Sequence, residues 1–220
     1  MLALESVSKR FHRRGEEVVA LDDANLRIER GEFVSIVGPS GSGKSTFLLL
    51  LGGMLSPSGG KVLLDGQSLY DLSPAERAAA RRKTVGFVFQ TFNLVPYLTA
   101  RENVMLPLLL AGVEESTQSE RATALLDRLG LGDRLDHKPR ELSVGQQQRV
   151  ALARVLANDP QVILADEPTG NLDPETGQVV QDFLEELHGE GRTLVMVTHN
   201  PQAAARAGRT LTLRGGRFEP

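Results

Sequence analysis

The sequence predicts an α/β fold with a parallel core sheet, an N-terminal antiparallel β-subdomain and an inserted helical subdomain. Three observations support this prediction. Short apolar runs recur along the chain, and each stops at a polar residue or a glycine, as the buried strands of a parallel sheet do. The first third of the chain is rich in strand-like segments. Helix-start signals dominate the middle of the chain.

Four apolar runs are the predicted strands of the core sheet, namely Phe33–Val37, Val85–Phe89, Val162–Ala165 and Leu194–Thr198. The residues that follow them are Gly38, Gln90, Asp166 and His199. Ligands of open parallel sheets bind outside the carboxyl ends of the strands. We therefore expect a glycine loop, an amide, a carboxylate and an imidazole to meet at one edge of the sheet.

The remaining elements have local signals of their own. Predicted N-terminal strands cover Leu2–Val7, Ala20–Ile28 and Lys61–Leu64, and Asp65-Gly66 is a strong hairpin signal. Helices are predicted to begin after Ser73, Thr99, Asp173 and Asn200, which are cap residues followed by proline or by a capping-box glutamate. Residues 73–140 should be mostly helical, and residues 210–218 should form a terminal hairpin around two glycines.

Composition excludes several classes of protein. The chain has 220 residues, of which 40% are hydrophobic and 24% are charged, and its formal net charge is −3. This balance differs from that of a disordered chain and from that of a polybasic protein, so we expect no nucleic-acid partner. The lack of cysteine excludes disulfides, thiolate zinc sites, iron–sulfur clusters and a cysteine nucleophile.

Neither the N-terminus nor any internal segment reads as a membrane anchor. The residues MLALESVSKR lack the apolar core of a signal peptide. The longest apolar stretches, 47–55 and 104–113, are too short and too interrupted to span a bilayer. We therefore expect a cytosolic protein that can still lie against a membrane.

Residues 38–46 match the phosphate-loop pattern G-x-x-x-x-G-K-[ST], and they are Gly38, Pro39, Ser40, Gly41, Ser42, Gly43, Lys44, Ser45 and Thr46. Glycines let successive backbone N–H groups point inward at a helix N-terminus, which attracts anions. Lys44 would neutralise the β- and γ-phosphates, and the Ser45 hydroxyl would bind Mg²⁺. The motif predicts a P-loop NTPase core, but alone it does not choose among kinases, GTPases, motor proteins and transport ATPases.

The other strand ends carry candidate catalytic groups. Asp166 suits Mg²⁺, and Glu167, which must point elsewhere because side chains alternate along a strand, would hold the attacking water beyond the γ-phosphate. Gln90 is either a further ligand of the metal or an ordinary loop glutamine. His199 is either a polar residue at a strand end or a hydrogen-bond donor to the γ-phosphate.

A second anion site is predicted at the helix that follows LSVGQ. Ser143 would be its N-cap, leaving the N–H groups of Val144, Gly145 and Gln146 free. One nucleotide does not need two such sites in one chain. Two copies facing head to tail would use both, each closing over the ATP of the other.

Taken together, GPSGSGKST, Gln90, LSVGQ, LADE, Asn171-Leu172-Asp173 and His199 resemble the ATP-binding subunit of ABC transporters over essentially the whole chain. GFVFQTFNLVP, LTARENV and LADEPTGNLD are similar to the branch that serves lipoprotein release and macrolide export, a group that also holds the cell-division ATPase. The resemblance implies one ATP-binding domain over residues 1–220, with a helical subdomain at about 91–157. It also implies an ATP-sandwich homodimer that lies, through integral membrane permease subunits, at the cytoplasmic face of the inner membrane.

The resemblance also implies roles for individual residues. Residues 38–46 would cradle the phosphates of ATP; Ser45, Gln90 and Asp166 would serve Mg²⁺; Glu167 would be the catalytic base; and His199 would sense the γ-phosphate. Ser143, Gly145 and Gln146 would contact the nucleotide of the second copy, Asp173 would lie in the loop that couples the two sites, and Phe11 would stack on adenine, unless it is a core phenylalanine at a strand end. The segment Gln90–Pro96 resembles the surface that receives the permease, with Phe92, Leu94 and Val95 as exposed apolar contacts.

The motifs leave two functions open and count against two others. A transport ATPase and a membrane regulator of the cell-division type both fit the motifs. A soluble ABC ATPase acting on DNA or ribosomes usually has long coiled-coil insertions or two ATPase halves, and this sequence has neither. A P-loop kinase would leave the Ser143–Gln146 signature without a purpose.

Val144 replaces the first of the two glycines usual in this signature. Because valine resists positive φ, we expect a helix-like or extended backbone there and a retained activity whose rate the substitution alters.

Overall fold

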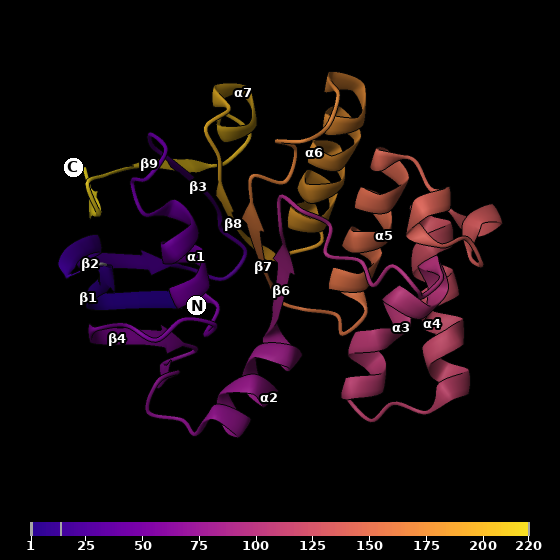
Figure 1. Ribbon diagram of the computed structural model, residues 1–220, viewed down its shortest axis with the longest axis horizontal. Helices are drawn as coiled ribbons and strands as arrows, with labels where there is room; N and C mark the ends of the chain where they lie inside the picture. Colours follow the sequence, from indigo (N-terminus) through magenta and orange to yellow (C-terminus); the bar gives the residue numbers. More distant parts are fainter. Residues whose placement is uncertain (1, 14, 220) are drawn as a thin grey trace.

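The computed structural model describes residues 2–13 and 15–219, and its core is a six-stranded sheet in the order β10-β9-β3-β8-β7-β6 (Figure 1). Its strands are β3 (Phe33–Val37), β6 (Val85–Val88), β7 (Val162–Asp166), β8 (Thr193–Val197), β9 (Arg209–Arg214) and β10 (Arg217–Phe218). Neighbours from β9 to β6 pair in parallel. The four predicted core strands therefore exist, are parallel, and send their carboxyl ends to one edge.

A second, antiparallel sheet is formed mainly by the N-terminal residues, in the order β2-β1-β4-β5. Its strands are β1 (Leu2–Arg13), β2 (Glu16–Ile28), β4 (Gly59–Leu64) and β5 (Gln67–Ser68). The predicted hairpin joins β4 to β5, and Asp65 and Gly66 both have positive φ, 50° and 82°, as a type I′ turn requires. Strands β1 and β2 run further than predicted because their polar outer halves pair with each other as an exposed ribbon.

The helices begin where their caps predict. α2 (Pro74–Thr84) and α3 (Ala100–Leu110) follow complete capping boxes at Ser73 and Thr99. The other helices are α1 (Lys44–Leu51), α4 (Glu115–Arg128), α5 (Val144–Leu156), α6 (Pro174–Gly189) and α7 (Pro201–Ala204), with short 3₁₀ turns η1 (Gly132–Arg134) and η2 (Pro139–Glu141). Because α3, α4 and α5 all lie between β6 and β7 in the sequence, they form a helical insert at the β6 edge of the sheet (Figure 1).

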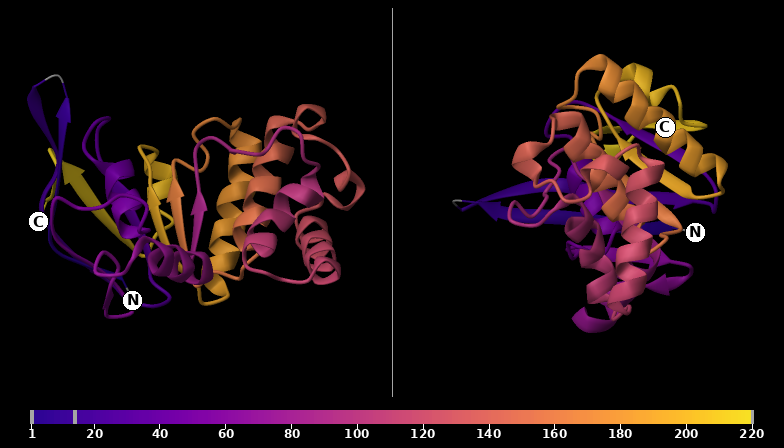
Figure 2. Two further views of the ribbon diagram at one scale, coloured as in Figure 1. Left: turned by 60° about the horizontal axis from the view of Figure 1, so that its bottom comes forward. Right: turned by 90° about the vertical axis from the view of Figure 1, so that its right-hand side faces the viewer.

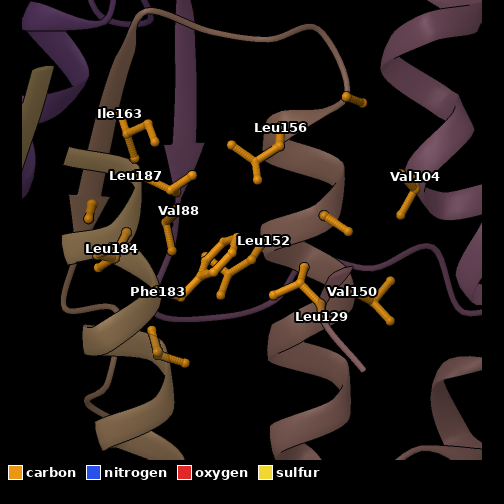
Figure 3. Packing of buried hydrophobic residues seen from close by; sticks show 14 of the residues in the cluster. Val88, Val104, Leu129, Val150, Leu152, Leu156, Ile163, Phe183, Leu184 and Leu187 are labelled. Carbon is orange, nitrogen blue, oxygen red and sulfur yellow. The ribbon is translucent and has the colours of Figure 1, made fainter. Parts of the chain in front are cut away.

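Successive side chains of β7 point to opposite faces of the sheet, and the buried hydrophobic residues accordingly form two clusters. Val162 and Leu164 pack with α1 and the N-terminal sheet, whereas Ile163 and Ala165 pack with α5 and α6. Figure 3 shows this second cluster, in which Leu152 and Leu156 of α5 lie opposite residues of α6 that include Phe183 and Leu187. Helix α1 is therefore sandwiched between the two sheets, which places its N-terminus at the edge where the core strands end.

Asn103 fixes the chain between β6 and α3. Its side chain is fully buried, accepts a hydrogen bond from the backbone N–H of Val95 at 2.8 Å, and donates to the carbonyls of Val95, Leu98 and Thr99 at 3.1, 3.1 and 2.9 Å. A buried amide with all these partners stabilises a loop that has no regular structure of its own. Asn103 therefore ties Val95, Leu98 and Thr99 to the first turn of α3.

Replacement of Asn103 by alanine should lower the free energy of unfolding by about 2 kcal/mol or more, because buried backbone groups lose their partners. Urea denaturation followed by circular dichroism measures the change. Asn158→Ala is the matched control, since the half-buried Asn158 makes one hydrogen bond, at 3.3 Å to the carbonyl of Pro107. Equal losses in the two variants would contradict the anchoring role of Asn103.

Candidate functional site

The carboxyl ends of the core strands open into a cleft of about 690 Å³. Figure 2 shows the arrowheads of β6 and β7 pointing to the same edge of the sheet. The cleft is lined by Val18, Val19, Ala20, Gly38, Pro39, Ser40, Gly41, Gly43, Lys44, Ser45, Thr46, Gln90, Asp166, Glu167 and His199. The glycine loop, the amide, the carboxylates and the imidazole thus meet as the strand pattern predicts.

The phosphate loop has the backbone that its glycines predict. Gly41 and Gly43 have φ of 78° and 104°, and Gly43 is the N-cap of α1 without a side-chain hydrogen bond to the helix. A Cβ on Gly43 would lie 2.2 Å from the carbonyl oxygen of Ala20, and one on Gly38 would lie 2.1 Å from that of Leu213. The first turn of α1 therefore offers N–H groups that no side chain caps, in a loop pressed between two strands.

Within this loop, Lys44 lines the cleft and Ser42 does not. The ammonium of Lys44 donates to the carbonyls of Gly38 and Pro39 at 2.7 and 3.1 Å, so it is already directed at the concave side of the loop. Ser42 is only 4% exposed, and its hydroxyl has no hydrogen-bond partner among the described residues. Because Ser42 does not line the cleft, its side chain is part of the packing beneath the loop.

Asp166 and Ser45 form a pair of oxygen donors. The Ser45 hydroxyl lies 3.2 Å from Oδ1 of Asp166. Burial raises the pKa of the Asp166 carboxyl, an effect that the Ser45 hydrogen bond opposes and the charge of Glu167 reinforces. Hydroxyl and carboxylate oxygens suit Mg²⁺, which keeps several non-protein ligands. The described residues contain no group of three or more His, Cys, Asp or Glu placed to hold a metal.

Glu167 lies just after β7 with a positive φ, so the strand alternation on which its predicted direction was based does not apply to it, although its hydrogen-bond partners differ from those of Asp166. Its Oε1 lies 2.8 Å from Nδ1 of His199, and its Oε2 accepts a hydrogen bond from the Thr198 hydroxyl at 3.1 Å. The Glu167 side chain is 15% exposed, whereas that of His199 is 71% exposed. The φ of Glu167 is 44°, an uncommon value for a glutamate, and a conformation of this kind persists only where surrounding contacts impose it.

Gln90 is connected to the loop before α6. Its Nε2 lies 3.4 Å from Oδ1 of Asn171, whose own amide donates to the backbone carbonyl of Gln90 at 3.1 Å. This arrangement leaves Oε1 of Gln90 as the side-chain atom able to bind a cation. The Gln90–Asn171 contact joins residues 81 positions apart, and no local sequence signal announces it.

The signature residues Ser143, Gly145 and Gln146 do not line the cleft of their own chain. Ser143 caps α5 in a complete capping box, because its hydroxyl accepts from the Gln146 N–H at 3.2 Å while Oε1 of Gln146 accepts from the Ser143 N–H at 2.9 Å. The prediction of a free Gln146 N–H was therefore wrong, since the serine cap itself uses that group. Val144 has no positive φ and begins the helix, as predicted.

Asp173 also lies outside the cleft and caps α6. Its carboxylate accepts hydrogen bonds from the N–H of Thr176 at 3.0 Å and from the Thr176 hydroxyl at 2.7 Å, and these bonds lower its pKa. Thr176 in turn packs against α5, because a Cβ on Gly145 would lie 2.6 Å from Cγ2 of Thr176. The beginnings of α5 and α6 therefore touch only because residue 145 is glycine.

Phe11 lies beside the cleft without lining it. It is 38% exposed on β1 and pairs across the ladder with Val18, which does line the cleft. Directly paired residues project to the same face of a sheet. The Phe11 ring, with the Lys9 ammonium 4.9 Å from its centroid, thus borders the cleft on the side of the N-terminal sheet.

One expectation for the segment after Gln90 was wrong. Phe92, Leu94 and Val95 are half-buried rather than exposed, and Leu94 packs against the core of the helical insert. The Asn103 contacts and the hydrogen bonds of Arg154 to the carbonyls of this loop draw it inward. Tyr97, 82% exposed, is the large apolar side chain that the segment presents to solvent.

The parallel sheet, the phosphate loop and the acidic strand end define a P-loop nucleotide-binding protein. The sequence matches the ABC transporter family over residues 21–170. The chain therefore belongs to the ABC transporter family. Among residues 2–13 and 15–219, no helix has the length and apolar character needed to cross a membrane.

Known proteins resemble the chain over nearly its whole length. It is 49% identical over 218 residues to the macrolide export ATP-binding/permease protein MacB of Hyphomonas neptunium, covering 99% of this chain and 34% of that protein. It is 47% identical over 216 residues to an uncharacterized ABC transporter ATP-binding protein of Methanocaldococcus jannaschii, with coverage of 98% and 96%. A dimeric structure of the ABC transporter cassette MJ0796 matches with a TM-score of 0.93 at 45% identity, covering 100% of this chain and 97% of that one. The chain thus spans about a third of the length of the MacB relative.

Gly43→Ala should weaken nucleotide binding by roughly 100-fold, because the new methyl group would force the Ala20 carbonyl and the start of α1 apart. Titration with a fluorescent ATP analogue measures the affinity. Gly41→Ala is the control, since φ there is also positive but no atom lies within 4 Å of the added Cβ, and backbone strain should cost only about 1 kcal/mol. An equal loss in both variants would contradict the packing argument.

Proposed function

We propose that this chain is the ATP-hydrolysing subunit of a membrane transporter, and that residues 1–220 act as one ATP-binding domain whose helical part is about 91–157. The observation that carries the proposal is the meeting of the phosphate loop, Asp166, Glu167 and His199 in one cleft. The MJ0796 cassette, 44% identical, is described in a dimeric post-hydrolysis state bound to ADP and Pi. That description supports the same reaction here.

The loop residues Gly38–Thr46, all of which except Pro39 carry a backbone N–H, would hold the triphosphate, and Phe11 would stack on the adenine. On binding, phosphate oxygens would replace the carbonyls that now accept hydrogen bonds from Lys44. Ser45, Asp166 and Gln90 would hold Mg²⁺. When bound, this ion supplies positive charge that neutralises the β- and γ-phosphate oxygens.

Hydrolysis requires that Glu167 change partners. Its Oε1 faces His199, so the imidazole must turn toward the γ-phosphate before Glu167 can accept a proton from water. The exposed His199 ring has room to turn, whereas the Thr198 hydroxyl and the surrounding strands hold Glu167 in place. Glu167 would then act as the general base while His199 donates a hydrogen bond to the γ-phosphate.

A second copy completes the site in this proposal. The capped start of α5, with the Ser143 hydroxyl and the N–H groups of Val144 and Gly145, lies outside the cleft of its own chain. Two copies facing head to tail would bring it to the ATP of the partner, with Gln146 and Asp173 beside it. The MJ0796 cassette that resembles this chain is described as dimeric.

Glu167→Gln should retain ATP binding, lose about 10²–10⁴-fold in hydrolysis rate and accumulate as a dimer, because the amide cannot accept the proton from water. Size-exclusion chromatography with ATP and Mg²⁺ measures the dimer. Glu175→Gln, an exposed acid in the first turn of α6, should remain active and should not accumulate as a dimer. A Glu167→Gln variant that stays monomeric with ATP would rule out the sandwich mechanism.

Ser143→Ala should reduce ATP hydrolysis by about tenfold or more while leaving ATP affinity of the monomer unchanged, since the hydroxyl would act on the ATP of the other copy. Wild-type activity should rise with the square of protein concentration at low concentration. Ser73→Ala removes a capping box of the same kind from α2 and controls for lost helix stability. A rate proportional to concentration and indifferent to Ser143 would contradict the proposal.

A groove of about 510 Å³ beside the Gln90–Pro96 segment is the surface that we propose as the docking site for a permease. Its apolar lining includes Met54, Phe87, Phe89, Leu106 and Leu110, and its charged lining residues are Arg81, Arg82 and Arg154. Since the described residues that line it include no acid, the groove suits an amphipathic helix with an acidic side chain. We propose that a permease helix of this kind docks here, which would hold the chain at the cytoplasmic face of the inner membrane.

The proposed cargo follows the named relatives. Several are macrolide export ATP-binding/permease proteins, in which the matching part is about a third of the whole. We propose that this chain drives extrusion of a macrolide-like compound, lipid or lipoprotein through a separate permease. Identification of the permease that co-purifies from detergent-solubilised membranes tests the proposal, and a four-span protein with a large extracytoplasmic domain is the expected result.

Arg82→Glu should reduce capture of that permease by roughly tenfold, because a groove that attracts an acidic helix would then repel it. The ATPase rate of the isolated chain should not change. Arg121→Glu, on the exposed face of α4, is the charge-matched control. Undiminished capture by the Arg82 variant would remove the groove as the docking site.

A further inference from the structure

A buried glutamine connects the signature helix to the residue that follows Glu167. Gln148 lies in α5, is fully buried, and donates a hydrogen bond from Nε2 to the carbonyl of Pro168 at 3.0 Å. Its Oε1 has no partner among the described residues. A polar side chain buried with half its capacity unused destabilises a core relative to an apolar one of the same size, so its presence calls for a reason other than stability.

The hydrogen bond of Gln148 ends on the turn Glu167–Gly170, which we call the catalytic turn. This turn closes through a hydrogen bond from the Gly170 N–H to the Glu167 carbonyl at 3.0 Å. On the other side, the Glu167 N–H donates to the Val197 carbonyl of β8 at 3.0 Å. Glu167 holds a positive φ although proline follows it, and a conformation of this kind persists only where surrounding contacts impose it. Gln148 is one of those contacts.

The same helix begins at the surface. Ser143 and Val144 are exposed, whereas Gln148, five residues after Ser143, is buried. An α-helix rises 1.5 Å per residue, so roughly 7.5 Å of rigid helix separates the two positions. The contact between Gly145 and Thr176 fixes the first turn of α5 against α6 as well. A displacement of the exposed end of α5 would therefore reach the catalytic turn through Gln148.

We propose that Gln148 is a positioning residue that makes hydrolysis at one nucleotide site depend on the nucleotide bound at the other. The inference rests on the proposed head-to-tail dimer, in which the exposed start of α5 contacts the ATP of the second copy. When that ATP seats α5, Gln148 sets the catalytic turn and hence Glu167 of its own chain. The effect runs from Ser143 to Glu167 within one chain, so loss of Gln148 impairs the site of the chain that carries the change.

Two mixed dimers separate this effect from a loss of contact with the partner nucleotide. In the first, a trace of Gln148→Met chain is mixed with a large excess of Glu167→Gln chain, so that the one competent Glu167 belongs to the chain lacking Gln148. In the second, a trace of wild-type chain is mixed with excess chain carrying both Gln148→Met and Glu167→Gln. Single-turnover hydrolysis of ATP is measured in each, beside wild-type chain with excess Glu167→Gln as reference.

The first mixture should hydrolyse ATP about tenfold or more slowly than the reference, since a shift of the base by a fraction of an ångström costs rate steeply. The second should match the reference. Equal rates in all three mixtures, or a loss in the second, would overturn the proposal. No hydrolysis in the reference itself would refute the proposed function instead.

Further variants control for a lost hydrogen bond in α5 and for a loss of stability. Gln147→Met removes a hydrogen bond of the same kind from the same helix, 3.1 Å long and directed to the Leu142 carbonyl, and should leave single-turnover hydrolysis unchanged. Gln148→Leu repeats the test with a second apolar side chain, and thermal melting identifies a variant that fails to fold. ATP affinity should be unchanged in both Gln148 variants, and a loss of affinity in parallel with rate would show a general structural defect and overturn the positioning role.

Discussion

The phosphate loop lies in close backbone contact with strands of both sheets, and these contacts place the two sheets relative to each other. Gly38 touches the Leu213 carbonyl of β9, and Gly43 touches the Ala20 carbonyl of β2, with no room for a Cβ at either place. Gly216 of the terminal hairpin connects the loop to β2. Its N–H donates a hydrogen bond to the Ser42 carbonyl of the loop at 3.2 Å, and its carbonyl accepts one from the backbone N–H of Asp22 in β2 at 2.9 Å. Both sheets and the terminal hairpin thus meet at the loop, and this contact gives it a fixed shape.

Local patterns predicted what depends on neighbouring residues in the chain. The four core strands, the β4–β5 hairpin and the caps at Ser73, Thr99, Asp173 and Asn200 all formed as expected, because hydrophobic alternation and capping act over a few residues. Contacts between distant segments had no such signal. The Gln90–Asn171 and Gln148–Pro168 hydrogen bonds, the burial of Phe92, and the use of the Gln146 N–H by its own cap emerge only once the chain is folded.

Helix α5 unites the parts of the candidate site. Its first turn carries the signature serine, its middle reaches the catalytic turn, and Arg154 near its end donates hydrogen bonds of 2.7 Å to the carbonyls of Phe92 and Asn93 beside the groove. Arg154 is half-buried, and burial lowers its pKa. A single helix therefore contacts, at successive turns, the surfaces assigned to a second nucleotide, to the base, and to a permease.

The position of Asp166 at the end of β7 limits the changes of strand length that the candidate site can tolerate. β7 pairs with β8 through Ala165–Met196 and Asp166–Val197, and with β6 through Val88–Ala165. One inserted or deleted residue in this strand would shift its register against both neighbours and carry the Asp166 carboxylate to the other face of the sheet. A change of length in β7 would therefore displace the candidate site, whereas one in a surface connection such as residues 111–114, between α3 and α4, would leave the site in place.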